Sequence, residues 1–365
     1  MRLTSLCTPH QKCAWTDAPP PRDPEAARGL VLRYGWHTVA YQILNPGIAH
    51  WLPPDRSGVV GYVASAGMWL AAGAPLGPPD RLADLAAAFA ATAARHGQRV
   101  AYFAAQAEFA DRLAHHGPLA RLPLGVQPVW NPQAWPALVA HKASLRAQLA
   151  RARNKGLTVE RWSASFAARQ PSLQACLAQW LAQRALPPMH FLVEPHALAA
   201  PADRIVFVAL RDKQPVAYLL ATPIPQRQGW LFEQLVRGKH APNGGAELLI
   251  DAAMREVALQ GATYATLGLV PLAQHPLLAA ELAAQPIHIR LLLDHLRSYG
   301  QAFYNFTGLQ QFRTRLQPAA WEPVYLLSHE RQTSLATLYA VAEAFAGVPL
   351  PLFLLQAVLR QICTF

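Results

Sequence analysis

The pattern of apolar and polar positions is most informative between Trp230 and Leu272. Apolar and polar residues first alternate, which predicts a strand, and Pro242-Asn243-Gly244-Gly245 then predicts a tight turn. Helical spacing follows, and a short apolar run ending at Gly268 predicts a second strand. A strand, a glycine turn and a helix direct backbone N–H groups and the positive helix end toward an anion or a developing oxyanion.

The same patterns recur along the chain and predict an α+β protein. The segment Val39–Ala74 indicates two or three strands, Asp80–Gly97 a helix and Gln98–Gln106 another strand. A second series predicts a helix over Leu173–Gln183, a strand over Arg204–Leu210 and a strand over Val216–Thr222. We therefore expect two similar mixed α/β halves within a chain of 365 residues, which is long enough for two domains.

The predicted domain boundaries follow changes in composition. Residues 1–30 contain Pro19, Pro20 and Pro21 and no apolar run of signal-peptide length, so a flexible lead-in is expected. We expect a first domain over 31–140, a basic helix over 141–156, a second domain over 157–330, and apolar helices over 331–365.

The net charge of the chain predicts a polyanionic partner. Lys and Arg exceed Asp and Glu by 11, which suggests nucleic acid or an anionic membrane surface. The most basic segment, "HKASLRAQLARARNKG", would place Lys142, Arg146 and Arg153 near one helix face, with Arg151 and Lys155 beside them. This face is either a solvated surface or a contact for the phosphates of a polyanion such as nucleic acid.

Other chemistries have little support in the sequence. The four cysteines are scattered and are expected to be reduced thiols of a cytosolic protein, and the fourteen histidines form no set of ligands, so no metal is expected. The glycine turn has neither the G-x-G-x-x-G spacing of dinucleotide sites nor the G-K-[ST] of a P-loop. No Gly-x-Ser-x-Gly motif is present.

The strand, glycine turn, helix and second strand resemble the acyl-donor site of GNAT-type N-acetyltransferases. In that family a Gln or Arg usually opens the pyrophosphate loop, whereas this chain has Ala241. No cofactor is therefore expected, and coenzyme A is kept only for the alternative acyltransferase function.

A narrower resemblance covers residues 34–327. Here the chain is similar to the catalytic domain of phosphatidylglycerol lysyltransferases and alanyltransferases, the multiple peptide resistance factors of bacterial type. The matching segments, in family order, are "GYVASAGMWLAAGAPLG", "ARARNKGLTVE", "LVRGKHAPNGGAELLIDAAM", "TLGLVPLA" and "YNFTGLQQFRTRLQPAAWEPVYLL". The resemblance implies two tandem GNAT-like folds joined by the basic helix. It also implies that the second fold, over 157–330, is catalytic and that the cations of the basic helix contact tRNA.

The resemblance also implies the roles of single residues. Glu233 is expected to be a catalytic base or an anchor for the substrate amine, although a salt bridge to Arg237 would also explain it. Glu247 is a second catalytic candidate that could simply stabilise the helix start. Asp251 is expected to pair with a base. The expected substrate contacts are Asn243, Gly244, Gly245, Tyr304, Arg313 and Arg315, with Arg237 as a further catalytic residue.

The implied activity is transfer of an amino acid from aminoacyl-tRNA to the hydroxyl of phosphatidylglycerol or of a related lipid or small molecule. Two alternatives remain open: an acyltransferase that uses coenzyme A or a carrier protein, and a non-enzymatic protein that binds nucleic acid or a membrane surface. A cytoplasmic location is expected. The apolar segment Leu335–Ile362 predicts two helices that either pack in the core or contact the inner face of the membrane.

Overall fold

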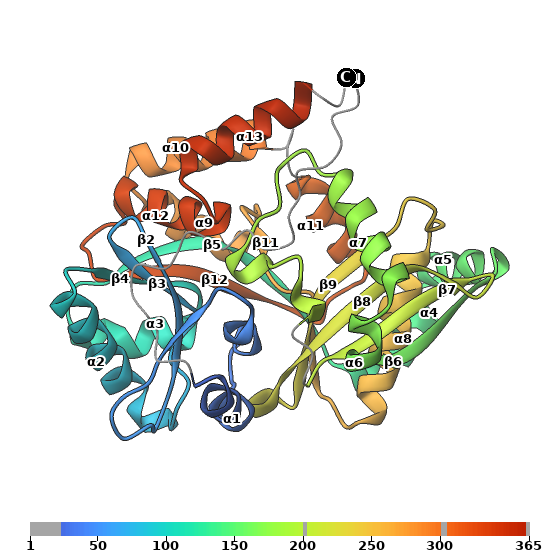
Figure 1. Ribbon diagram of the computed structural model, residues 1–365, viewed down its shortest axis with the longest axis horizontal. Helices are drawn as coiled ribbons and strands as arrows, with labels where there is room; N and C mark the ends of the chain where they lie inside the picture. The colour runs from blue at the N-terminus through green and yellow to red at the C-terminus, as the bar shows by residue number, and fades with distance from the viewer. Residues whose placement is uncertain (1–22, 200–202, 301–304, 363–365) are drawn as a thin grey trace.

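The computed structural model describes residues 23–199, 203–300 and 305–362, and these residues form one mixed sheet of twelve strands (Figure 1). Eleven strands follow the order β1-β2-β3-β4-β12-β5-β10-β9-β8-β7-β6, and β11 pairs with β5. The strands are β1 (Ala49–Trp51), β2 (Val60–Ser65), β3 (Met68–Ala72), β4 (Arg99–Gln106), β5 (Ala120–Trp130), β6 (Leu157–Ser163), β7 (Ile205–Arg211), β8 (Gln214–Ile224), β9 (Gly229–Arg237), β10 (Tyr264–Thr266), β11 (Val270–Pro271) and β12 (Ala320–Ser328).

The sheet combines antiparallel ladders with two parallel pairs, β3 with β4 and β9 with β10. The helices are α1 (Pro24–Tyr34), α2 (Leu82–Arg95), α3 (Ala107–Leu113), α4 (Trp135–His141), α5 (Ala143–Asn154), α6 (Ala164–Ala168), α7 (Pro171–Ala182), α8 (Gly245–Leu259), α9 (Ala279–Ala283), α10 (Ile287–Gly300), α11 (Phe306–Arg315), α12 (Leu335–Ala346) and α13 (Leu350–Ile362). The expected mixed α+β class is confirmed.

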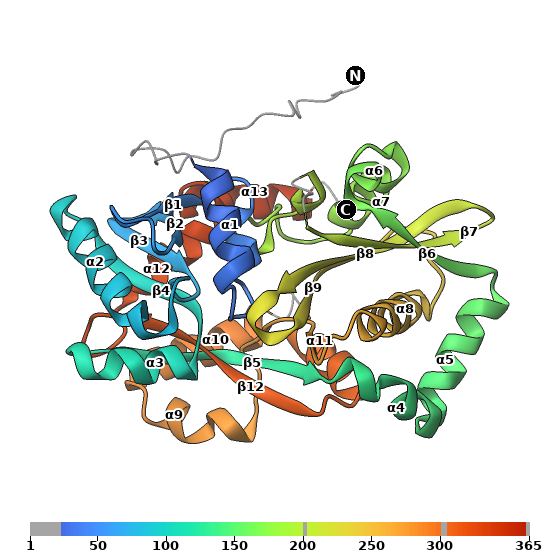
Figure 2. The same ribbon diagram turned by 90° about the horizontal axis from the view of Figure 1, so that it is seen from below.

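Each half of the sheet has apolar side chains on both faces because helices cover both faces. In the half formed by β6–β10, Leu249 and Met254 of α8 pack on one face, while Leu173 and Cys176 of α7 pack on the other. Figure 2 shows α8 on one side of these strands and α6 with α7 on the opposite side.

In the other half, α2 and α3 cover one face and α1 and α12 cover the other. Phe89 and Phe109 come from the first pair of helices, and Val31 and Ala344 from the second. The two halves meet where β10 pairs with β5 over only two residue pairs, so one sheet continues through a narrow junction.

The local predictions for the second half agree closely with the structure. The stretch that begins at Trp230 forms β9, a turn, α8 and β10, and the predicted helix over Leu173–Gln183 is α7. The two predicted C-terminal helices are α12 and α13. Local patterns suffice here because each of these elements is one continuous run of residues with its own spacing or turn signal.

β12 occupies a position that the predicted boundaries did not anticipate. The boundaries assigned Ala320–Ser328 to the second domain, yet β12 pairs antiparallel with β4 and β5 of the first half. The strand lies between them because its buried residues, such as Tyr325 and Leu327, complete the core beneath α2 and α3. The division into two domains stays a prediction.

Candidate active site

The frame of the candidate site is β9, the glycine turn, α8 and β10. β9 pairs in parallel with β10 only from Gly229 to Leu231, opposite Tyr264 to Thr266. Beyond Leu231, β9 continues to Arg237 in its ladder with β8 alone. The two parallel strands therefore separate on the side where β9 leads into the glycine turn and α8.

Glu233 lies at an irregularity of β9, immediately beyond this separation. Leu220 of β8 pairs with Gln234 and Ala221 with Phe232, so Glu233 has no partner in the ladder. An extra residue of this kind bends the strand and redirects its side chain, a feature common beside active sites. The carboxylate points toward the 3-10 helix Tyr41–Leu44 of the first half.

The Glu233 carboxylate is enclosed by donors. Gln42 Nε2 donates to it at 3.1 Å, Asn45 Nδ2 at 3.2 Å and Arg204 Nε at 3.4 Å. The side chains of Arg204 and Glu233 are only 1% and 5% exposed. The ion pair of Glu233 is thus with Arg204, and the alternative of a salt bridge to Arg237 is wrong.

Arg237 and the glycine turn lie at the far end of β9. Arg237 Nη2 donates to the carbonyl of Ala241 at 3.4 Å, and its Nε is buried without a hydrogen-bond partner. Gly244, at φ +93°, caps α8, and a Cβ there would lie 2.8 Å from the Gln148 carbonyl of α5. Position 244 needs glycine because its backbone lies in the left-handed region and a side chain there would collide with α5.

The neighbouring predicted residues differ in exposure. Asn243 is exposed, Gly245 is buried as the first residue of α8, and Glu247 is half-buried in the first helical turn. A carboxylate in this turn is stabilised by the helix dipole. The frame consequently offers backbone N–H groups at the start of α8, with Arg237 nearby.

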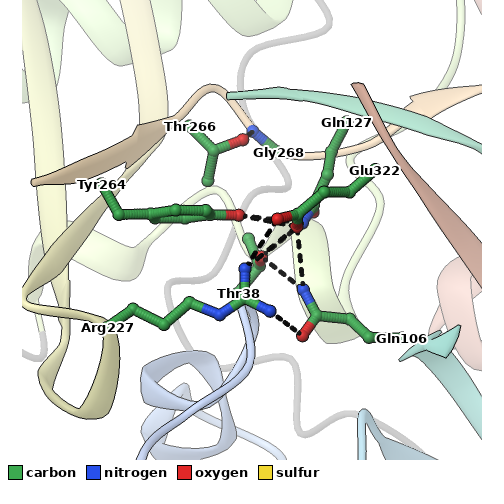
Figure 3. A network of polar contacts seen from close by, with 8 residues as sticks. All are labelled: Thr38, Gln106, Gln127, Arg227, Tyr264, Thr266, Gly268 and Glu322. Atoms are coloured by element: carbon green, nitrogen blue, oxygen red, sulfur yellow. Dashed lines mark hydrogen bonds and ion pairs between the residues drawn. The ribbon is translucent and has the colours of Figure 1, made fainter. Parts of the chain in front are cut away.

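A second polar network fills the junction between the halves (Figure 3). Its centre is Glu322 of β12, whose carboxylate accepts from Tyr264 Oη at 2.9 Å, Gln127 Nε2 at 2.8 Å and Arg227 Nη1 at 2.9 Å. Gln106 accepts from Arg227 Nη2 at 2.9 Å. Burial and the Glu322 carboxylate raise the pKa of Tyr264 well above its usual range, so its hydroxyl stays protonated.

Glu322 differs from Glu233 in its access to solvent. Its side chain is 31% exposed, and that of its partner Arg227 is 24% exposed. The donors that hold it come from four separate elements: Gln106 of β4, Gln127 of β5, Arg227 of the 3-10 turn Pro225–Arg227 and Tyr264 of β10. Gln127 Nε2 also donates to Thr38 Oγ1, at 2.8 Å. The network therefore positions an accessible carboxylate, as a proton-transfer site requires.

One short segment after α1, residues 37–45, contributes side chains to both the Glu322 network and the Glu233 cluster. Thr38 belongs to the Glu322 network, whereas Gln42 and Asn45 belong to the Glu233 cluster. His37, the first residue of the segment, is fully buried, and its Nε2 bonds to the carbonyl of Ala74 at 2.9 Å. Burial, with Arg227 nearby, lowers the pKa of His37 to about 4, so the ring is neutral near pH 7.

The two predicted arginines of α11, Arg313 and Arg315, lie in different environments. Arg313 of α11 is buried and donates to the carbonyls of Leu267 at 2.6 Å and Gly268 at 2.5 Å, which holds the loop after β10. This structural role differs from the predicted substrate contact. Arg315 is exposed, and Tyr304 lies outside the described residues.

The basic segment forms α5, and its five predicted cations are not equivalent. Arg146 Nη1 contacts the carbonyl of Ala140 at the end of α4, and Arg153 Nη2 lies 3.3 Å from the buried carboxylate of Asp251. The pairing predicted for Asp251 is confirmed, with Arg255 as a second partner at 2.9 Å. Lys142 is half-buried at the start of α5, whereas Arg151 and Lys155 are exposed.

Sequence reasoning missed residues that only the fold brings together. Arg204, Gln42 and Asn45 are far from Glu233 along the chain, and none belongs to a recognisable motif. Glu322 had a usable signal, because it follows Trp321 in a segment that matched the family. Over the described residues, no group of three or more His, Cys, Asp or Glu side chains could hold a metal ion.

Comparisons with known proteins identify what the chain resembles. The family described as phosphatidylglycerol lysyltransferase, C-terminal, matches residues 28–328. No functionally curated protein matches the sequence.

Solved structures share the fold at low sequence identity. The C-terminal domain of a putative lysylphosphatidylglycerol synthetase from Agrobacterium fabrum is 22% identical, with a TM-score of 0.73, over 89% of this chain and 98% of that one. L-PGS from Bacillus licheniformis is 18% identical, with a TM-score of 0.71, over 90% and 97%. FemX is 10% identical, with a TM-score of 0.52, over 88% and 98%.

Proposed function

We propose that this chain, which belongs to the family of the phosphatidylglycerol lysyltransferase C-terminal domain, is an aminoacyltransferase. The proposed donor is aminoacyl-tRNA, and the proposed acceptor is the hydroxyl of phosphatidylglycerol or of a related lipid or small molecule. The observation that carries the proposal is the family match over residues 28–328, which spans both polar clusters and the frame between them. We further infer that the two halves are tandem GNAT-like folds joined by α5.

The chemistry requires positioning more than activation. An aminoacyl ester is already activated, so the enzyme must orient the two substrates, accept the proton of the acceptor hydroxyl and stabilise the tetrahedral oxyanion. The ester bond to tRNA then breaks, and its ribose oxygen takes up a proton as it leaves. Glu322 is the proposed proton acceptor, because it is partly exposed and held by Gln127 and Tyr264. Glu233 is the proposed positioning residue, because its buried carboxylate already binds Arg204.

The donor is proposed to approach over α5 and the start of α8. Gly244 brings the turn against Gln148 of α5, so this helix packs beside the frame. It carries exposed Arg151, and exposed Lys155 caps its end. Phosphates of tRNA would contact these cations. Arg237, with its buried Nε, and the N–H groups at the start of α8 would face the ester or its oxyanion.

The test is transfer of label from a mixed pool of radiolabelled aminoacyl-tRNAs to anionic liposomes, followed into the organic phase. Wild-type protein is expected to label the lipid, and Glu322→Gln, Glu233→Gln and Arg237→Ala are expected to lose at least about tenfold in rate. Glu160→Gln, an exposed carboxylate change on β6, is the matched control and should keep full activity.

Other outcomes separate the alternatives. Turnover of an acyl thioester without tRNA would replace the proposal by a coenzyme A or carrier-dependent acyltransferase, whose donor would use the same frame of β9, α8 and β10. Binding of tRNA without any labelled acceptor, lipid or soluble, would leave only a binding protein and overturn the proposed enzyme activity.

A further inference from the structure

Exposed apolar side chains are concentrated on three helices. Of the fourteen large apolar residues that are exposed among the described residues, ten lie on α10, α12 and α13, so this exposure is not scattered. In Figure 1 α10 and α13 lie at the upper edge of the molecule, and α12 lies beneath them. The ten residues, here called the apolar helix surface, are Ile287, Leu291, Leu296, Leu335, Tyr339, Leu352, Leu354, Leu355, Val358 and Leu359.

α13 shows most clearly that this surface is unusual. Phe353 and Ala357 face the protein and are buried. At 100° per residue, the opposite side of the helix carries Leu352, Leu355, Val358 and Leu359, and Leu354 lies on its flank; all five are between 44% and 55% exposed. The helix is therefore apolar on its outer side as well as on its inner side, unlike the surface helix of an ordinary soluble domain.

Length and shape suit a surface contact better than a membrane crossing. Within the described residues no single helix is long and apolar enough to cross a membrane, whereas α12 and α13 together would pass on length and composition. They are bent by 53° at the break between them, and part of α12 is buried against the sheet. A helix whose inner face is occupied can offer only its outer face to lipid.

Charge distinguishes a lipid surface from a second copy of the chain. Leu350–Ile362 contains no acidic residue. α10 carries exposed Arg290, and its exposed carboxylate, Asp294, is paired with Arg297 of the same helix. Because the net charge is +11, pairing two copies would bring like charges together, while anionic headgroups would attract them. We propose that the apolar helix surface docks on an anionic phospholipid bilayer.

The surface is also connected to the candidate site. His190 N donates to the carbonyl of Phe345 in α12 at 2.9 Å, and Phe191 packs on the Phe345 ring. The next residue, Leu192, accepts from Gln42 Nε2 at 2.9 Å, and Gln42 also holds Glu233. Docking would thus place lipid against α12, from which these contacts lead to Glu233. The relevance of this connection to transfer rests on the proposed function.

The test is cosedimentation of the full chain with vesicles of phosphatidylglycerol and phosphatidylcholine, and with vesicles of phosphatidylcholine alone. The double variant Leu355→Gln with Leu359→Gln should bind the anionic vesicles about a hundredfold more weakly, because two leucines no longer leave water. The matched control, Leu259→Gln with Leu277→Gln, changes two exposed leucines outside the surface and should bind as wild type does. Circular dichroism and urea unfolding check that each variant is folded.

Two results would overturn the proposal. One is equal vesicle binding by the wild type and the double variant. The other is a wild-type dimer in sedimentation velocity that the double variant splits while neither binds vesicles, which would make a second copy the occupant.

The docking proposal and the proposed function fail separately. Transfer to monomerically dispersed, short-chain phosphatidylglycerol without vesicle binding would reject docking and keep the function. Vesicle binding without labelling of any acceptor would keep the docking proposal and reject the proposed function.

Discussion

Arg153 and Asp251 form an ion pair whose two ends lie in different environments. Arg153 Nη2 lies 3.3 Å from Asp251 Oδ2, and the arginine side chain is 56% exposed while the carboxylate is 3% exposed. Asp251 also accepts from Trp135 Nε1 at 3.0 Å and from Arg255. The pair therefore fastens α5 to α8, which belongs to the frame of the candidate site.

Removal of this carboxylate should destabilise the fold. Asp251→Ala leaves the buried indole N–H of Trp135 without an acceptor and is expected to lower the free energy of unfolding by about 2–4 kcal/mol. Urea denaturation measures this. Asp294→Ala removes a carboxylate that is 66% exposed and paired with Arg297, and should cost less than about 0.5 kcal/mol. Equal losses in the two variants would contradict the structural role of Asp251.

The exposed cations of α5 should control the salt dependence of tRNA binding. Arg151→Gln with Lys155→Gln is expected to reduce the slope of log affinity against log salt by about 2, because two phosphate contacts are lost. Arg153→Gln should change the slope less, because Arg153 is already paired with Asp251. Filter binding over a salt series gives the slopes, and an unchanged slope in the double variant would remove α5 from the tRNA contact.

The glycine turn permits a test with an internal reference. Gly244 and Gly261 both have positive φ, +93° and +83°, but only Gly244 has neighbours within reach of a Cβ. Gly261→Ala should cost about 1 kcal/mol from backbone strain alone. Gly244→Ala should cost more, because its Cβ would also displace Gln148 and Ala152 of α5. Chemical denaturation of both variants isolates the contact between the turn and α5.

His37 should make stability depend on pH. Because its pKa is about 4 in the folded protein and near 6.5 in the unfolded chain, the unfolded state binds the proton first as pH falls. The contribution is complete above about pH 6.5 and decreases toward pH 4, with a loss of about 2 kcal/mol by pH 5. Urea unfolding at pH 7.5 and pH 5 should show this loss in the wild type and a smaller one in His37→Gln. The same loss in both proteins would mean that other groups cause it.

Tyr264 is expected to matter for rate more than for folding. Tyr264→Phe removes the hydroxyl that donates to Glu322, and the transfer rate should fall about tenfold to a hundredfold. The loss should appear mainly in kcat, with a change in unfolding free energy of about 1 kcal/mol. Tyr102→Phe, whose hydroxyl bonds to the Ala86 carbonyl away from the network, is the control. Full activity of Tyr264→Phe would argue against Glu322 as the proton acceptor.

Features encoded locally were predictable from the sequence. The turn at Asn243–Gly245 and the helix after it follow from glycine and from apolar spacing, so the frame was located correctly. The surroundings of Glu233 were not predictable, because Arg204 reaches it across the pairing of β7, β8 and β9, and the segment of Gln42 meets it only through the packing of two halves. A carboxylate on a strand has the same local pattern whether it binds a cation nearby or one from a distant loop.

Long-range pairing explains the other differences. The position of β12 depends on hydrogen bonds to β4 and β5, about 200 residues earlier, and apolar alternation does not encode the partner of a strand. The role of Arg313 also depends on long-range packing. The position of α11 decides whether this side chain faces a substrate or bonds to the Leu267 carbonyl, as it does here. The C-terminal helices were predicted as helices, and which of their faces would remain exposed was a matter of tertiary packing.

The late arrival of β12 affects how this protein can fold during synthesis. When a ribosome has released β4 and β5, the space between them is empty until Ala320–Ser328 has emerged. Until then two neighbouring strands present unpaired backbone edges, the type of surface on which nascent chains aggregate. Expression yield should therefore depend on chaperones that shield the first half, and on the speed at which the remainder is translated.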